Sequence, residues 1–176
     1  MLYLIERVVD TTPEPSTFEQ VREVAAKAGG ELIEVQVSAA LQRAYFVVEL
    51  DGPAARVEGH LRVASLPFES VAPVRLVGAD LAQVKAARGG AQYLVEWDLP
   101  KELTMDQYLA RKKEKAPLYA KVPEVKFLRT YVREDMLKCL CLYDGPDEEA
   151  IRRAREAVST PISRLGTVQQ EPSPVA

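Results

Sequence analysis

The amino-acid sequence predicts an α+β protein built from two tandem ferredoxin-like βαββαβ repeats, whose antiparallel sheets pack face to face as an intrachain pseudo-dimer. Two repeated signals support this prediction. Residues 2–6 read Leu-Tyr-Leu-Ile-Glu, and residues 92–96 read Gln-Tyr-Leu-Val-Glu. An Asp-Gly-Pro tripeptide then follows an apolar strand in each half, at 51–53 and at 144–146. The same signals in the same order indicate an internal duplication.

The first repeat has a signal at most of its boundaries. Residues 2–9 are rich in β-branched and aromatic side chains, which favours a strand. A helix over 16–28 begins at Ser16, with Glu19 at the capping-box position, and ends at two glycines. The Asp-Gly-Pro turn leads into the second helix. The remaining elements are a hairpin of two strands, the second helix and a fourth strand, at 31–38, 44–50, 54–65 and 71–77.

The second repeat follows the same order. Its first strand covers 92–98. Its first helix begins near Thr104 and is interrupted by Pro117, because proline inside a helix causes a kink. The other elements are a hairpin, a helix and a strand, at 124–132, 136–143, 147–158 and 162–168. We divide the chain into a first repeat, a linker, a second repeat and a disordered tail, at 1–77, 78–90, 91–168 and 169–176.

The predicted strands are apolar on both faces. In the strand over 136–143, Leu140 and Leu142 point one way, whereas Cys139 and Cys141 point the other way. Two helices cover only one face of a four-stranded sheet, so the second face needs another cover. The other repeat supplies that cover, which predicts an inter-sheet space in a monomeric pseudo-dimer or a homodimer.

Composition excludes several classes of function. The formal net charge is −3 and the pI is about 5.4, so we expect no nucleic-acid partner. The aromatic strand signature of RNA-binding βαββαβ domains is also missing. No apolar stretch approaches the roughly 20 residues that span a bilayer, and we expect no membrane partner. The N-terminus lacks a signal-peptide pattern, and two cysteines alone form no disulfide framework, which predicts a cytoplasmic protein. The absence of asparagine favours a thermophilic or GC-rich bacterial source.

Three groups of residues carry chemistry that a core does not require. Cys139 and Cys141 offer two thiols, but a closed soft-metal site needs about four ligands, so we expect buried structural cysteines. His60 is the only histidine, and we expect it on a helix surface rather than as a metal ligand or general base. The basic run at 111–115 is expected to be a solvated helix face.

Glu6 and Glu96 occupy equivalent places in the two first strands. If both point between the sheets, they form a carboxylate pair that suits acid–base chemistry or a hard cation. If not, each pairs structurally with an arginine, for example Arg129. A charged residue between the sheets must be paired or functional, so these residues and two candidate walls, Tyr131 and Trp97, make up the predicted ligand site. Strand alternation places Trp97 and Glu96 on opposite faces.

The second repeat resembles a family of small bacterial ferredoxin-fold proteins, mostly of unassigned function, that is labelled nickel-binding-protein-like. The resemblance is clearest over 92–168 and rests on residues 93–100, which read Tyr-Leu-Val-Glu-Trp-Asp-Leu-Pro, and on residues 139–143 and 146–152. It implies a sheet-to-sheet dimer and, in some members, a divalent metal held by histidines. Where relatives often carry histidine, this chain has Arg129 and Ala154, with His60 as the best match in the first repeat. We therefore expect no cofactor and only weak binding of nickel or zinc.

Two classes of function follow from these expectations. The first is a non-enzymatic, stress-type module that binds a small-molecule ligand or a cation between its sheets. The second is a cofactor-independent enzyme of the dimeric α+β barrel kind, with its active site in the same place. An enzyme would need a cavity lined by convergent polar groups, and the sequence offers few of these. The sequence therefore favours the binding module.

Overall fold

The computed structural model describes residues 1–87 and 90–170, and residues 88–89 and 171–176 lie outside the described part. In chain order, the first half contains β1 (Leu2–Val8), α1 (Pro15–Lys27), β2 (Gly30–Ser38), β3 (Arg43–Leu50), α2 (Ala54–Val63) and β4 (Ser70–Val77). A short helix, α3 (Leu81–Ala87), follows. The second half contains β5 (Tyr93–Asp98), α4 (Met105–Lys115), the 3-10 helix η1 (Ala116–Lys121), β6 (Lys126–Arg133), β7 (Lys138–Asp144), α5 (Glu148–Ala157) and β8 (Arg164–Thr167).

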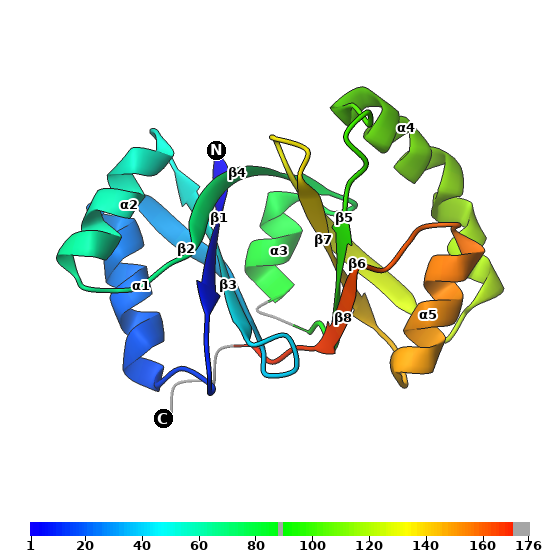
Figure 1. Cartoon of the computed structure of the whole chain (residues 1–176), viewed down its shortest axis with the longest axis horizontal. Helices are drawn as coiled ribbons and strands as arrows, with labels where there is room; N and C mark the ends of the chain where they lie inside the picture. The colour runs from blue at the N-terminus through cyan, green and yellow to red at the C-terminus, as the bar shows by residue number, and fades with distance from the viewer. Residues whose placement is uncertain (88–89, 171–176) are drawn as a thin grey trace.

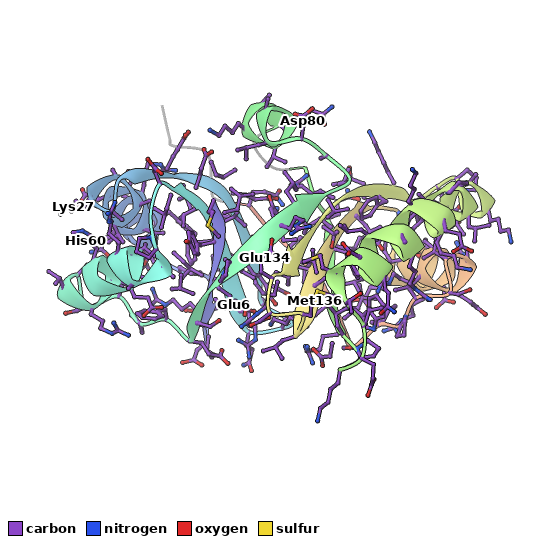
Figure 2. The ribbon with its side chains drawn as sticks, turned by 90° about the horizontal axis from the view of Figure 1, so that it is seen from above. Glu6, Lys27, His60, Asp80, Glu134 and Met136 are labelled. Atoms are coloured by element: carbon purple, nitrogen blue, oxygen red, sulfur yellow. The ribbon has the colours of Figure 1, made fainter. Side chains whose placement is uncertain are left out.

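The helices and strands form layers, with the strands in the middle of the molecule. Helices α1 and α2 flank one side, and α4 and α5 flank the other (Figure 1). Helix α3 lies over the middle, between the two halves, as the view from above also shows (Figure 2). The order is therefore helices, strands of the first half, strands of the second half, helices.

The two halves share one strand order, and their sheets are joined. Strands run β2-β3-β1-β4 in the first half and β6-β7-β5-β8 in the second, all antiparallel. Edge strands β4 and β6 also pair with each other, from Val74 opposite Arg133 to Val77 opposite Thr130. At the other end, Val37 in β2 exchanges two backbone hydrogen bonds with Gln169 just after β8. The sequence predicted two separate sheets packed face to face. In the structure the two sheets are joined into one eight-stranded sheet, which curls into a nearly closed barrel.

Three apolar clusters fill the layers. One lies between α1, α2 and their strands, and a second lies between α4, α5 and theirs. The third lies between the two halves, and it confirms that the sheets face each other. Its buried members come from both repeats: Leu4, Tyr45, Val47, Val74, Ala91, Leu94, Tyr131, Leu140, Leu142 and Val168.

A Ser-x-Pro sequence recurs at 65–67 and 159–161, where it ends helix α2 in the first half and helix α5 in the second. Ser65 and Ser159 adopt left-handed backbone angles, with φ of 56° and 52°. In each case the serine N–H bonds back to the third residue before it, and the next N–H bonds to the carbonyl of Leu61 or Arg155. This double bond pattern is a Schellman motif, which satisfies the last carbonyls of a helix. Matching motifs at matching places support the duplication.

One capping prediction is wrong. Helix α1 begins at Pro15, and its N-cap Glu14 makes no side-chain cap hydrogen bond, so Ser16 and Glu19 form no capping box. Proline at the first helical position is already set for helical geometry and lacks the N–H that a cap would satisfy. The capping box occurs in the second repeat, where Thr104 and Gln107 bond each other's backbone N–H groups. Helix α4 ends before Pro117 and continues as η1, as the proline predicted.

The stretch predicted as a linker contains helix α3, which packs against the first half. Its Val84 is buried, and Lys85 contacts the carboxylates of Glu31 and Glu49 at 3.2 and 2.8 Å. Most of the predicted disordered tail, 171–176, lies outside the described residues, as does part of the linker. No helix within 1–87 or 90–170 is both long enough and apolar enough to cross a bilayer.

Candidate functional site between the two sheets

The two predicted carboxylates meet between the sheets. Glu6 in β1 and Glu96 in β5 are 3% and 0% exposed. Both contact the same ammonium group, because Lys138 Nζ lies 2.6 Å from Glu6 Oε1 and 3.0 Å from Glu96 Oε1. Figure 2 shows Glu6 in the middle of the molecule, close in projection to Met136 at the tip of the β6–β7 hairpin. Lys138 is the first residue of β7, directly after the turn of that hairpin, and from there its side chain reaches both carboxylates.

Each carboxylate also has partners of its own. Ser70 Oγ donates to Glu6 Oε2 at 3.2 Å, and Arg133 lies 3.7 Å from the same oxygen. Tyr45 OH donates to Glu96 Oε1 at 2.9 Å, and Arg164 Nε donates to Glu96 Oε2. Every carboxylate oxygen is therefore bonded or paired, as burial of a charge requires. We name Glu6, Glu96, Lys138 and Tyr45 the carboxylate cluster.

The charges in the carboxylate cluster shift the pKa values of Glu96 and Tyr45. Burial raises the pKa of Glu96, but the hydrogen bond from Arg164 and the charge of Lys138 outweigh burial, so the net shift is downward. Burial and the Glu96 charge both raise the pKa of Tyr45. At neutral pH the cluster therefore holds an ionised Glu96 beside a protonated Tyr45.

The pair is less symmetric than the sequence repeat indicated. Glu6 lies opposite Tyr45 on one neighbouring strand and Ser70 on the other. Glu96 lies opposite Leu140 and Arg164. The duplication thus supplies two carboxylates, while their partners differ between the repeats.

Arg129 and Tyr131 belong to a second polar group, around Glu34 in β2. Arg129 Nε donates to both oxygens of Glu34, at 3.1 and 3.0 Å, and Tyr131 OH donates to Glu34 as well. Gln36 Nε2 donates to Glu34 at 2.8 Å and completes its partners. Each predicted carboxylate does contact an arginine, Glu6 with Arg133 and Glu96 with Arg164, but the example Arg129 is not that partner, because it pairs with Glu34 in β2. Burial lowers the pKa of Arg129, and its bond to Glu34 more than offsets that effect.

Trp97 and His60 do not join either polar group. Trp97 lies on the helix side of β5, with its ring 6.2 Å from the Tyr108 ring of α4, so it is no wall of the inter-sheet site. This position follows from the strand alternation that the sequence indicated. His60 lies on α2 at the outer edge of the molecule, far from Glu6 (Figure 2).

Sequence reasoning missed Tyr45 and Lys138 of the carboxylate cluster and Glu34 and Gln36 of the second group. Glu34 and Lys138 are the charged residues among them. Lys138 precedes Cys139 and, like Leu140 and Leu142, points between the sheets, so alternation could have identified it. Glu34 lies at a register shift in the β2–β3 pairing, between Leu32 and Glu34, which the sequence does not show.

The metal implied by the family resemblance does not fit these residues. Nickel and zinc favour imidazole and thiolate ligands, and the single histidine lies on the outer face of α2. In the described part of the chain, no three histidine, cysteine, aspartate or glutamate residues are grouped so that they could hold a metal ion. The carboxylate cluster contains its own cation, Lys138, in the place between the two carboxylates.

Comparisons with known proteins support the fold and part of the family resemblance. The crystal structure of putative chlorite dismutase TA0507 matches with a TM-score of 0.53 and 14% identity, covering 96% of this chain and 94% of that chain. At this identity the match shows the fold alone. No curated protein sequence matches the chain. Residues 93–168 match the model of the family described as nickel responsive protein SCO4226-like. The second repeat is thus similar to the SCO4226-like family, within a chain whose two repeats together share the fold of that chlorite dismutase-like structure.

Proposed function

We propose that this protein is a non-enzymatic module that binds a small cation, best matched by a primary ammonium group, between its two sheets. The observation that carries the proposal is the convergence of two buried carboxylates on one ammonium, at 2.6 and 3.0 Å. Carboxylates at such depth are costly unless a cation satisfies them. The carboxylate cluster therefore has the charge and the hydrogen-bond acceptors that a cationic ligand needs.

Lys138 is a cation that can leave the cluster. Its side chain is 14% exposed, whereas those of Glu6 and Glu96 are 4% and 1% exposed. A lysine ammonium sits on a flexible four-carbon stem, so it can swing toward solvent while the carboxylates stay in place. In the proposed function, Lys138 occupies the site when it is empty of ligand, and an external ammonium competes with it.

The relation to a nickel-responsive family is compatible with a module that responds to a cation. The ligand differs, because oxygen ligands suit ammonium groups and hard cations better than nickel. Magnesium and calcium are therefore the inorganic competitors to test beside an amine.

One observation bears on the enzymatic alternative, the hydrogen bond between Tyr45 and Glu96. A general acid or base works best with a pKa near the operating pH. Burial raises the pKa of Tyr45, whereas Arg164 and Lys138 lower the pKa of Glu96 against the effect of burial. Both pKa values shift away from neutral pH, which favours binding over proton transfer.

Calorimetric titration with methylammonium tests the proposal. Wild-type protein should bind methylammonium weakly, and Lys138→Met should bind it about tenfold or more tightly, because the competing tethered cation is gone. Glu96→Gln should remove binding in both backgrounds. Tetramethylammonium, which has no N–H donor, should bind much less.

The matched control is Lys126→Met, which removes an exposed lysine from neighbouring strand β6 and should leave binding unchanged. Tighter binding of magnesium or calcium than of methylammonium by Lys138→Met would reassign the ligand to a hard cation. Failure of wild type and Lys138→Met to bind any of these cations would overturn the proposal.

A further inference from the structure

The two cysteines lie in a polar pocket of the core, on the opposite face of the second repeat from the carboxylate cluster. Cys139 and Cys141 follow each other on the helix side of β7, and both are fully buried. Their Sγ atoms are 3.9 Å apart. They were expected to pack as small hydrophobic side chains, but Cys141 also has polar and charged neighbours within the apolar cluster.

Two cations and a hydroxyl surround the Cys141 sulfur. Arg155 Nη1 from α5 lies 3.5 Å from it, and Lys112 Nζ from α4 lies 3.6 Å from it. Thr130 Oγ1 from β6 lies 3.0 Å away. Three elements that are distant in sequence thus direct polar groups at one sulfur atom. The arrangement is a built environment rather than a lone thiol.

Arg155 needs an anion, and Cys141 is the one in reach. Arg155 is 1% exposed, and arginine stays protonated in proteins. Its other hydrogen bonds go to neutral oxygens, Tyr143 OH at 3.1 Å and Pro161 O at 2.5 Å. Within 1–87 and 90–170, no carboxylate pairs with Arg155 or with Lys112. A buried cation without a counterion is strongly unfavourable, so Cys141 as a thiolate completes the charge balance.

The titration of the two thiols agrees with this charge balance. The hydrogen bond from Cys139 lowers the pKa of Cys141; burial opposes it, and Lys112 and Arg155 lower it further. The same bond, together with burial, raises the pKa of Cys139. Of the two thiols, Cys141 is therefore the one whose ionised form its surroundings favour.

The first repeat shows that the fold does not require this chemistry. Three residues before Asp-Gly-Pro stands Val48 in the first repeat and Cys141 in the second. Four residues before the left-handed serine stands Leu61 in the first repeat and Arg155 in the second. The positions that these turn and helix-end signals align thus carry hydrocarbon in one repeat and a thiol–guanidinium pair in the other. The pair is a feature of the second repeat alone.

A small cavity lies beside Lys112. It has a volume of about 20 Å³ between α4, η1 and the end of α5, enough for about one water-sized molecule. Lys112 and Tyr108 line it. Lys112 therefore connects the cavity with the Cys141 sulfur, which does not itself line the cavity.

We propose that Cys141 is a peroxide-reactive thiolate that hydrogen peroxide oxidises to a sulfenic acid. The thiolate sulfur attacks one peroxide oxygen, the S–O bond forms and the O–O bond breaks. The leaving hydroxide takes a proton from Lys112, which regains one from solvent, so one water is released. Sulfur loses two electrons and peroxide gains them. Thiol reductants then restore Cys141.

Two single-thiol variants test the proposal. Cys139→Ser keeps Cys141 with a hydroxyl neighbour, and Cys141→Ser keeps only Cys139. Each is treated with hydrogen peroxide at pH 7, folded and in urea, and the sulfenic acid is trapped with a cyclic diketone and quantified by mass spectrometry. Folded Cys139→Ser should react about tenfold faster than in urea, because a free thiol is only a few per cent thiolate, while a lower pKa also lowers nucleophilicity. Cys141→Ser should react more slowly folded than in urea.

A matched pair on α4 tests the role of the cation. Lys112→Met should slow oxidation of Cys141, whereas Lys113→Met, one residue along and without an ion pair in the described part, should not. The rate for folded Cys139→Ser should also stay flat from pH 6 to pH 8, where a free thiol would accelerate. A folded Cys141 that reacts no faster than the unfolded one, or a rate that rises with pH like a free thiol, would overturn the proposal.

Discussion

The helix-side cores of the two repeats occupy the same place in the fold but differ in chemistry. In the first repeat, Val48 and Leu61 belong to an apolar cluster under α1 and α2. In the second repeat, the positions that match them in sequence carry Cys141 and Arg155, which lie 3.5 Å apart. The βαββαβ scaffold therefore tolerates a buried charged pair at positions where hydrocarbon suffices. Polar chemistry there reflects something other than the needs of folding.

Breaking the charged pair in the second repeat should have the largest effect on stability. Cys141→Val leaves Arg155 buried without an anion and should lower the free energy of unfolding by about 3–5 kcal/mol. The double variant Cys141→Val/Arg155→Leu copies the first repeat and should recover most of that loss. Urea unfolding followed by circular dichroism measures both. A double variant as unstable as the single one would show that the two cores are not interchangeable.

Replacing each of the two buried carboxylates should lower the free energy of unfolding by a different amount. Glu96→Gln loses charge-assisted bonds from Arg164 and Lys138 and should cost about 2–3 kcal/mol. Glu6→Gln weakens one charge-assisted bond, from Lys138 at 2.6 Å, and should cost about 1.5 kcal/mol, because its other partners are the neutral Ser70 and Arg133 at 3.7 Å. Chemical denaturation at pH 7 compares them. Equal losses would mean that the shared Lys138 dominates both sites.

The pH dependence of stability should identify the contribution of Glu96. Its pKa is lower in the folded protein than the ordinary value of 4.5, so folding favours its charged form. The stabilisation is complete above the unfolded pKa and is lost as the pH falls through the folded pKa. The stability difference between wild type and Glu96→Gln should therefore be constant at neutral pH and shrink below about pH 4.5. A difference that instead grows on acidification would contradict the direction of the shift.

The smallest expected change in stability concerns the left-handed serine that ends the second helix of each repeat. Ser65 and Ser159 both hold left-handed backbone angles at the end of helix two. Glycine adopts these angles without a steric penalty, so Ser65→Gly and Ser159→Gly should each stabilise the protein by about 0.5–1 kcal/mol. Thermal unfolding detects the change. A gain in one repeat and a loss in the other would show that the matched turns carry different strain.

Much of the fold could be predicted from particular residues. The repeated Asp-Gly-Pro and Ser-x-Pro sequences fixed the order of elements, because turns and helix ends need specific backbone angles that few residues adopt. Strand alternation correctly separated Glu96 from Trp97 and Leu140 from Cys141. Ser16 misled the prediction of the start of α1, because the local pattern of a capping box does not exclude a proline-led helix start. The repeat boundaries, the bacterial thermophile source and the ligand remain predictions.

By itself, the sequence determined that the chain is a duplicated α+β protein with one carboxylate at the equivalent place in each first strand. Local signals of two to four residues are enough for that, because turn chemistry and strand alternation act at short range. Only the tertiary structure decided which cation meets which carboxylate, that β4 pairs with β6, and that Arg155 and Lys112 enclose Cys141. These contacts join residues that are between 14 and 132 positions apart, and their geometry depends on how whole elements pack together.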